Sequence, residues 1–219
     1  MLSIPGQPLL DKNRLVGRCV RLAVEFDLAR LQREVSALPQ HHWGTRGGRV
    51  GVHNPAQAVF LRGYAPAMGE MPIEDREPLD ALPAVRELIE SILPAPPMRC
   101  LLAMLPAGAV IAPHVDSGDY FLQTIRIHVP VFTHPRTWMF CAGLSYHMAA
   151  GEVWALNNAT VHAVWNADPA QSRTHLICDF LPTRELVDLL VRGERDLGRE
   201  EPAVDAHLFA ARPPLAQDA

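Results

Sequence analysis

Three residues in the second half of the chain have side chains that commonly bind metal ions. His114 and Asp116 are two positions apart, and His162 follows much later. On extended backbone, residues two apart point to the same side, so an imidazole and a carboxylate there can bind one ion. A histidine from a distant strand completes a face of three ligands. Two neutral imidazoles and one carboxylate leave coordination positions open, which is typical of Fe(II) sites that also bind O₂ and a co-substrate.

The same three ligand types also bind zinc together with a catalytic water, so a zinc hydrolase is the main alternative to an Fe(II) site. Arg173 favours iron over zinc, because its guanidinium can hold the carboxylate of a dicarboxylate bidentately. Only the turn NADPAQS and a few strand residues separate Arg173 from His162. We therefore expect a hairpin to bring Arg173 back beside the strand of His162.

Two segments place further polar residues on one side of a strand. From 125 to 131 every odd position is Ile or Val, and the opposite face carries Arg126 and His128. The segment 173–181 likewise alternates, with Arg173 and His175 on one face. A single strand of this kind is usually a surface strand with one wet face. Two such strands, each presenting an Arg and a His, predict the lining of a pocket instead.

The elements that must position these residues are short strands. Between 98 and 182, β-prone runs of five to nine residues alternate with turn-rich pieces, which favours an antiparallel sandwich or barrel. Helical spacing of apolar residues predicts helices over 28–38, 79–93 and 183–197, and a first strand is expected within 14–24. The fold class is therefore mainly β with flanking helices.

Composition narrows the classes of function. The chain has 219 residues, 48% of them hydrophobic, and a formal net charge of -4. It lacks the basic face that nucleic acids or membrane surfaces require, and no stretch approaches the roughly 20 apolar residues of a membrane span. The four cysteines form no CxxC pair, which favours reduced thiols. We expect a cytoplasmic protein with neither a nucleic-acid nor a membrane partner.

Four pieces of the sequence together carry a family resemblance. They are PHVD at 113–116, RIHVPVFTHP at 126–135, YHMAAGEVWALNNATVHAVWN at 146–166 and SRTHLICDF at 172–180. In this order and spacing they resemble the aspartyl/asparaginyl β-hydroxylase family of Fe(II)- and 2-oxoglutarate-dependent oxygenases. The resemblance implies a double-stranded β-helix, a cupin-like jelly roll, with helices outside. We expect one oxygenase domain with an N-terminal helical part over 1–182, then a C-terminal helix and tail over 183–219.

The resemblance also implies roles for the candidate residues. The predicted metal ligands would bind Fe(II), with 2-oxoglutarate as co-substrate and O₂ as oxidant. Arg173 would hold the distal carboxylate of 2-oxoglutarate. His128 and Arg126 match positions that help bind the co-substrate in some members. In other members the arginine of that strand meets the substrate, so both roles stay open for Arg126.

The resemblance further bears on the substrate. Some members that act on protein side chains lack the carboxylate of the H-x-D pair, whereas Asp116 matches members that act on free amino acids such as proline. We expect hydroxylation of a free amino acid or small derivative, with release of succinate and CO₂. The alternatives are a peptidyl Asp/Asn β-hydroxylase and a non-catalytic cupin-like binding module. The helix over 183–197 could serve a homodimer.

Candidate substrate contacts come from the N-terminal half and from one asparagine. The stretch 40–66 is rich in Gly, His and Arg, and from it we select His53 and Arg62. Either Arg62 or Arg126 could hold an amino-acid carboxylate. Asn158 lies four residues before His162, where it could contact the substrate or support a metal ligand.

Overall fold

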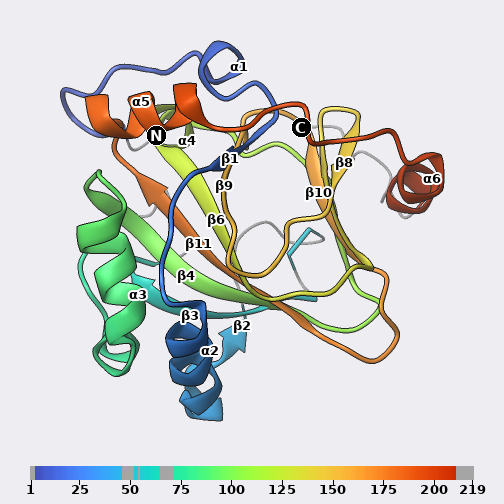
Figure 1. The fold of residues 1–219 in the computed structure, drawn as a ribbon, viewed down its shortest axis with the longest axis horizontal. Helices are drawn as coiled ribbons and strands as arrows, with labels where there is room; N and C mark the ends of the chain where they lie inside the picture. The colour runs from blue at the N-terminus through green and yellow to red at the C-terminus, as the bar shows by residue number, and fades with distance from the viewer. Residues whose placement is uncertain (1–2, 46–51, 54, 65–71, 211–219) are drawn as a thin grey trace, which may run out of the picture.

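The computed structural model describes residues 3–45, 52–53, 55–64 and 72–210, and this part contains two antiparallel β-sheets that face each other (Figure 1). The larger sheet runs β1-β9-β6-β11-β4-β3-β2, and the smaller runs β5-β10-β7-β8. The strands of the larger sheet are β1 (Cys19–Leu22), β2 (Gly44–Thr45), β3 (Gln57–Arg62), β4 (Pro97–Leu105), β6 (Ile125–Phe132), β9 (Val153–Leu156) and β11 (Arg173–Phe180). Those of the smaller sheet are β5 (Val110–His114), β7 (Thr137–Cys141), β8 (Leu144–Tyr146) and β10 (His162–Asn166).

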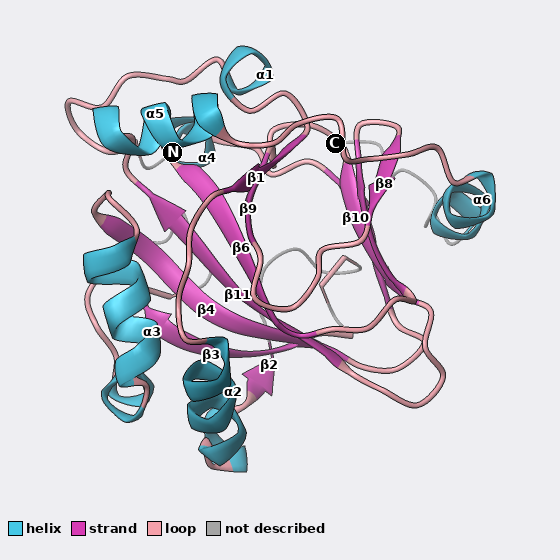
Figure 2. Ribbon diagram, viewed as in Figure 1, coloured by secondary structure: helices cyan, strands magenta, loops and turns pink. Residues whose placement is uncertain are grey.

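The helices lie outside the two sheets (Figure 2). They are α1 (Lys12–Leu15), α2 (Leu28–Ala37), η1 (Gln40–His42), η2 (Glu77–Ala81), α3 (Pro83–Glu87), η3 (Leu88–Ile92), α4 (Asp119–Gln123), α5 (Arg184–Arg192) and α6 (Pro202–Ala210). The predicted architecture, mainly β with flanking helices, is confirmed. None of the helices in the described ranges has the length and apolar character needed to cross a lipid bilayer.

Apolar and polar residues alternate along strands β6 and β11, and, as predicted, their polar faces lie on the same side of the sheet. The two strands are direct neighbours, with Ile177 opposite His128 and Asp179 opposite Arg126. The odd-numbered residues of β6 from 125 to 131 join a large hydrophobic cluster. The opposite faces of β6 and β11 turn toward the smaller sheet. Both strands are buried on both sides, because helices cover one face and the smaller sheet covers the other.

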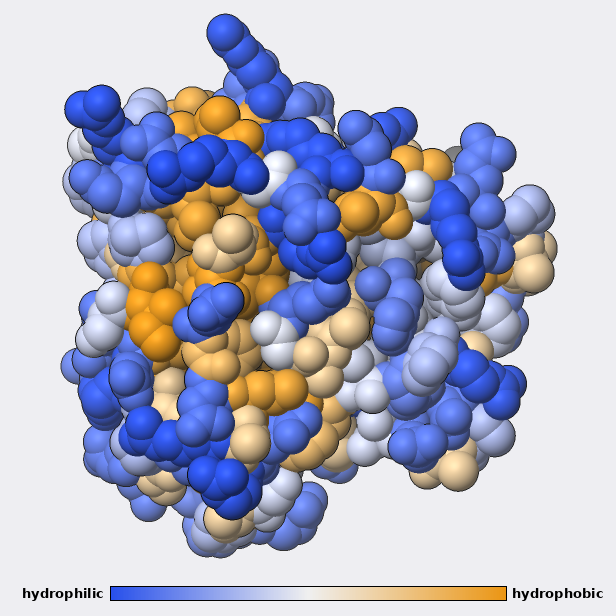
Figure 3. All heavy atoms as spheres, viewed as in Figure 1, coloured by the Kyte–Doolittle hydropathy of each residue, from blue (hydrophilic) through white to orange (hydrophobic). Residues whose placement is uncertain are grey.

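The large hydrophobic cluster lies between the seven-stranded sheet and helices α2, α3 and α5. Helix α2 begins where the Asp27 carboxylate accepts a hydrogen bond from the Arg30 N–H, and it buries Leu31 and Val35. Helix α5 begins with the same kind of cap from Thr183. Apolar atoms, in orange, reach the surface between α5 and the α2–α3 side of the molecule (Figure 3). The apolar sides of these helices thus pack on the outer face of the larger sheet, and the inner face of that sheet carries the polar groups.

Several elements differ from the sequence expectations. The helix expected over 79–93 is interrupted at Pro83, which lacks the N–H that a continuous helix requires and separates η2 from α3; α3 then continues directly into η3. Helix α5 ends at Arg192 rather than near 197. Strand β5 lies within 106–119, one of the turn-rich pieces between the expected β-prone runs, and α1 occupies part of the segment expected as the first strand. Helix α6, which we did not predict, packs Val204 and Leu208 against the outside of the smaller sheet.

Two expectations stay predictions. The structure does not test the division into a domain over 1–182 and a C-terminal part over 183–219, and residues 211–219 lie outside the described ranges. Self-association through α5 also stays a prediction, although Val191 on that helix is 68% exposed. The four cysteines are buried and free, as expected for reduced thiols.

Candidate metal centre and co-substrate cavity

The two candidate histidine ligands lie on neighbouring strands of the smaller sheet. His114 ends β5, His162 begins β10, and the two residues are partners in the antiparallel register. Their ring centroids are 4.2 Å apart. Both side chains are buried. The sheet register therefore brings together two imidazoles that are far apart in the sequence.

Backbone carbonyl groups fix how each imidazole is presented. The Nδ1 atom of His114 lies 2.7 Å from the Ala112 carbonyl oxygen, and the Nδ1 atom of His162 lies 2.9 Å from that of Thr160. A carbonyl only accepts, so each Nδ1 carries the proton and each Nε2 presents a lone pair. This is the usual way in which proteins orient a histidine that binds a metal ion.

The candidate carboxylate ligand, Asp116, is held in place by hydrogen bonds from two sides. Its backbone N–H donates to the Asn158 carbonyl at 2.9 Å, and Asn158 Nδ2 donates to Asp116 Oδ2 at 3.0 Å. Arg126 Nη1 donates to the same oxygen. Burial alone would raise the pKa of Asp116, but the positive charge of Arg126, together with the hydrogen bond from Asn158, opposes this, and the pKa lies far below its usual value. Asp116 is therefore an anion at any physiological pH.

These three side chains fit a divalent ion. One nitrogen from each histidine and one oxygen of Asp116 all lie within 4.8 Å of one another. The Nε2 atom of His114 is 3.8 Å from Asp116 Oδ1, and that of His162 is 3.9 Å from Asp116 Oδ2. Two neutral imidazoles and one anionic carboxylate form the facial set that suits Fe(II). The structure thus brings together all three predicted ligands.

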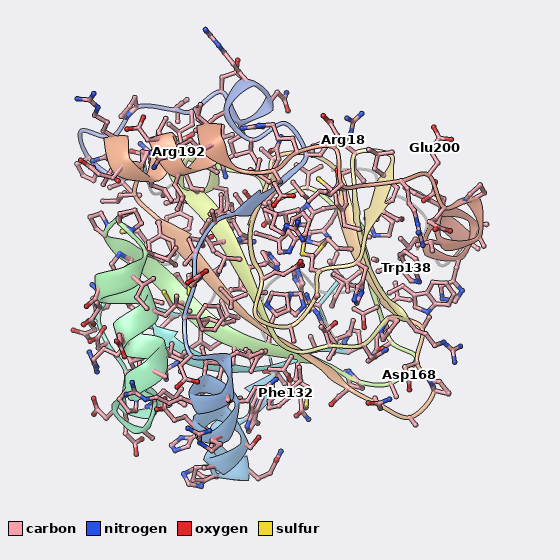
Figure 4. The ribbon with its side chains drawn as sticks, in the orientation of Figure 1. Arg18, Phe132, Trp138, Asp168, Arg192 and Glu200 are labelled. Carbon is pink, nitrogen blue, oxygen red and sulfur yellow. The ribbon has the colours of Figure 1, made fainter. Side chains whose placement is uncertain are left out.

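A small cavity of about 30 Å³ lies between the sheets at this point. Figure 4 shows side chains from both sheets converging on the space between them, with labelled Trp138 on the side toward α6. The cavity is lined by Ala56, Ala103, Met104, Leu105, Ile111, His114, Arg126, His128, Met139, His162, Val164, Arg173 and Ile177. The two candidate histidine ligands lie on one wall and the three predicted co-substrate residues on the other, while Asp116 follows directly after β5.

The route by which Arg173 reaches this cavity corrects the hairpin expectation. Strands β10 and β11 lie in different sheets, and β11 pairs with β4 and β6. The turn between them is a crossover from the smaller sheet to the larger one. Arg173 therefore faces the metal ligands across the cavity instead of lying beside the strand of His162.

Beside Arg173, the inner face of the larger sheet carries two further histidines. The rings of His128 and His175 meet edge to face, with centroids 5.8 Å apart. Both residues are buried. Burial lowers the pKa of His175 well below its usual value, and the positive charge of Arg173 lowers it further. His175 is therefore a neutral neighbour of the Arg173 guanidinium.

Arg126 occupies a central position among buried carboxylates. Its Nε and Nη2 atoms donate to the two oxygens of Asp179 at 2.8 and 3.0 Å, and its Nη1 donates to Asp116. The Phe121 ring lies 5.1 Å from the guanidinium carbon. Burial alone would lower the pKa of Arg126, but Asp179 and Asp116 raise it. Three of its donors are thus directed at protein carboxylates.

The three candidate substrate residues have different surroundings. His53 meets the ring of His114 edge to face at 4.8 Å, so the structure brings it to the metal site. Asn158 contacts Asp116 as described above. Arg62 does not line the cavity, because its guanidinium pairs with Asp75 and donates to the Pro97 carbonyl. Within the stretch 40–66, residues 46–51, 54 and 65–66 lie outside the described ranges.

Sequence reasoning missed three charged residues of this site. Lys12 donates to Asn158 Oδ1, Asp179 binds Arg126, and Arg99 Nη2 lies 3.7 Å from Asp179 Oδ2. Asp179 shares the strand face of Arg173 and His175, and that alternation is a signal that could have identified it. Neither Lys12 nor Arg99 belongs to a pattern that points to the site, because their proximity arises only from tertiary contacts.

Comparisons with solved structures bear on the fold. An oxidoreductase of the 2OG-Fe(II) oxygenase family from Burkholderia pseudomallei has 16% sequence identity and a TM-score of 0.53, and the match covers 78% of this chain and 86% of that one. It supports the double-stranded β-helix fold. A prolyl-4-hydroxylase from Pseudomonas putida matches with 18% identity and a TM-score of 0.48, covering 80% and 97% of the two chains.

The family model described as aspartyl/asparaginyl beta-hydroxylase matches residues 49–182, which is more than half of the chain. The matched range contains the three candidate metal ligands, Arg173 and the strand that carries Arg126 and His128. The chain therefore belongs to the aspartyl/asparaginyl β-hydroxylase family of Fe(II)- and 2-oxoglutarate-dependent oxygenases.

Proposed function

We propose that this protein hydroxylates a C–H bond of a free amino acid or small amino-acid derivative, with Fe(II) bound by His114, Asp116 and His162. The observation that carries the proposal is the division of one cavity between two walls. Two of the metal donors, His114 and His162, lie on the smaller sheet, and Arg173 and His128 face them from the larger sheet. A keto acid that chelates the metal can extend its far carboxylate to Arg173, whose guanidinium suits bidentate binding.

When bound, Fe(II) with 2-oxoglutarate and O₂ supplies the oxidant that replaces a hydrogen of the substrate by a hydroxyl group, while the co-substrate leaves as succinate and CO₂. The chain's own residues bind and orient the reactants. Arg173 and His128 hold the co-substrate against the metal face. The apolar lining, including Leu105, Ile111 and Val164, keeps water from the space between the sheets. No side-chain acid or base is needed for this division of roles.

The charge of the site supports an anionic substrate. The cavity between the sheets must admit this substrate as well as the co-substrate. Next to it, Lys12, Arg99 and Arg126 carry three positive charges, and Asp116 and Asp179 carry two negative ones. An amino-acid carboxylate would balance the excess positive charge.

Among the candidate anchors for that carboxylate, we favour Arg99. Arg126 directs three donors at Asp116 and Asp179, and Arg62 is paired with Asp75. Arg99, by contrast, comes no closer than 3.7 Å to Asp179, and its buried Nε has no hydrogen-bond partner among the described residues. Its guanidinium carbon lies 5.9 Å from the Phe121 ring, which also contacts Arg126. Arg99 therefore has donors left for an incoming carboxylate.

A coupled assay tests the proposal. Purified protein with Fe(II) and 2-oxoglutarate is incubated with each of the twenty free amino acids, with their carboxamides, and with Asp- or Asn-containing peptides, and succinate is measured. We expect at least one free amino acid to accelerate succinate release and its carboxamide to fail. Acceleration by peptides alone would contradict the substrate class and leave the oxygenase chemistry in place.

The anchor is tested on whichever amino acid responds. Replacing Arg99 by Met should raise the KM for that amino acid about 10- to 100-fold, because the loss of a hydrogen bond to a charged group weakens binding by about that factor. The KM for 2-oxoglutarate should change little. Arg62→Met is the matched control and should change neither constant. Equal effects of the two substitutions would contradict the assignment of Arg99.

A further inference from the structure

Lys12 is the single lysine of this chain, and it is almost completely buried. All the other basic side chains apart from histidine are arginines. Lys12 begins helix α1 and is 2% exposed. Its Nζ donates to the side-chain oxygen of Asn158 at 2.5 Å. A residue from the beginning of the chain thus reaches the loop that precedes His162.

Asn158 passes this contact on to the metal site. Its Oδ1 accepts from Lys12, and its Nδ2 donates to Asp116 Oδ2 at 3.0 Å. An ammonium group has donors and no acceptor. It therefore requires that the amide oxygen of Asn158 face Lys12, and this leaves the amide nitrogen to face Asp116. If the amide group of Asn158 were flipped, its oxygen would face the Asp116 carboxylate and repel it.

The N-terminal segment does not depend on Lys12 for its docking. Asn157 Nδ2 donates to Asn13 Oδ1 at 2.9 Å and to the Gly17 carbonyl at 2.7 Å. Arg195 Nη1 donates to the Val16 carbonyl at 2.9 Å, and its Nη2 donates to that of Leu15 at 3.0 Å. These bonds hold helix α1 from two other sides. The contact between Lys12 and Asn158 is thus additional to those that fasten the helix.

Burying this ammonium group is costly. Burial lowers the pKa of Lys12 to about 8, while Asp179 and Asp116 oppose the shift and Arg126 adds to it. An apolar side chain of similar length would avoid that penalty, because it has no charge to remove from water. A charge kept at this position against such a cost indicates a specific task.

We infer that Lys12 is a positioning residue of the metal centre, which sets the orientation of the Asn158 amide and through it the orientation of the Asp116 carboxylate. The inference rests on the metal ligands of the proposed function. Held by Asn158 and Arg126 on Oδ2, the carboxylate keeps its other oxygen toward the His114 side of the site. The helix at the beginning of the chain is thus part of the metal site.

The first test uses Co(II) alone, since its visible spectrum reports the arrangement of its ligands. Wild type and Lys12→Met are titrated with Co(II), and their thermal unfolding is compared. We expect Lys12→Met to fold, to bind Co(II) about 10-fold more weakly, as is typical when an outer hydrogen-bond partner of a ligand is lost, and to show an altered Co(II) band. An unchanged affinity and band would overturn the inference.

Arg195→Met is the matched control. It removes the bonds that hold the same helix but touches neither Asn158 nor Asp116. It should lower the unfolding temperature and leave the Co(II) band as in wild type. An equal change of the band in both variants would mean that only docking of α1 matters, which overturns the specific role of Lys12. Failure of wild type to bind Co(II) would instead contradict the proposed function.

A second test leaves Lys12 unchanged and so does not depend on the folding of Lys12→Met. Because the chain has one lysine, ¹³C-labelled lysine gives a single side-chain signal in NMR. Diamagnetic Zn(II) should shift this signal in wild type, and the shift should be largely lost in Asn158→Ala. A lysine signal that does not shift when Zn(II) is added, or one that shifts equally in Asn158→Ala, would overturn the inference.

Discussion

The two walls of the cavity hold their functional groups by different means. On the smaller sheet, the rings of His114 and His162 are each oriented by the carbonyl of the residue two positions before it. On the larger sheet, Arg126 is charged and is held by the carboxylates of Asp116 and Asp179, which lie 10 and 53 residues away in sequence. One wall is thus organised by local backbone geometry, and the other by charge pairing between side chains.

This difference follows from what each wall has to do. A metal ligand must present a lone pair in a fixed direction, and a backbone carbonyl fixes the tautomer without adding charge. A wall that binds anions must keep positive charge in a buried place, and this is stable only where carboxylates partly balance it. Damage to the smaller sheet should therefore remove metal binding, whereas damage to the larger sheet should reduce co-substrate binding or stability.

The largest effect is expected from His162→Ala. It removes one of three ligands, so we expect Fe(II) binding to fall by more than the roughly 10- to 100-fold that loss of a mere outer partner costs, with no detectable turnover. Calorimetric titration with metal measures the loss, and circular dichroism verifies the fold. Metal affinity within a few-fold of wild type would show that the smaller sheet is not the metal wall.

Next in size is the effect of Arg126→Met on stability. The substitution leaves Asp116 and Asp179 buried beside each other without their shared cation, and breaking such a pair costs about 3–5 kcal/mol. Urea unfolding of the metal-free protein measures this cost. Arg184→Met is the control: that side chain is 90% exposed in its pair with Asp188, and its loss should cost below about 1 kcal/mol. Similar values for the two variants would contradict the charge-pairing account.

Arg173→Ala should separate the co-substrate from the metal. We expect the apparent Kd for 2-oxoglutarate to rise about 30-fold, as for loss of a charge-assisted hydrogen-bonded pair, with Fe(II) affinity within about two-fold of wild type. Arg136→Ala, at an exposed position, should change neither value. If 2-oxoglutarate and Fe(II) binding fell equally, Arg173 would be misplaced on the larger sheet.

The smallest effect is a pH dependence of stability through His175. Burial and Arg173 lower its pKa in the folded state, so below about pH 6.5 the unfolded chain binds a proton that the fold excludes. Stability should therefore fall as pH drops from 6.5, by at most about 1.4 kcal/mol per pH unit for this one proton. Unfolding of wild type and His175→Leu between pH 8 and 5 measures the contribution. Parallel pH profiles would contradict it.

The same contrast explains what the sequence could predict. The H-x-D pair and the alternation of 125–131 and 173–181 are local patterns, so the metal ligands and the polar strand faces could be assigned before the structure. The strand pairing could not, and so the expected hairpin after His162 was in fact a crossover between sheets. Lys12 and Arg99 were missed for the same reason, because their roles depend on partners far along the chain.

The central claim is that one cavity lies between the histidine metal ligands on the smaller sheet and the co-substrate residues on the larger sheet. One spectrum tests this claim directly. Under anaerobic conditions, Fe(II) and then 2-oxoglutarate are added to wild type, His162→Ala and Arg173→Ala, and the weak visible charge-transfer band of a chelated keto acid is recorded. We predict a band in wild type, no band in His162→Ala, and in Arg173→Ala a band that needs much more 2-oxoglutarate. Absence of the band from folded, metal-loaded wild type would contradict the account.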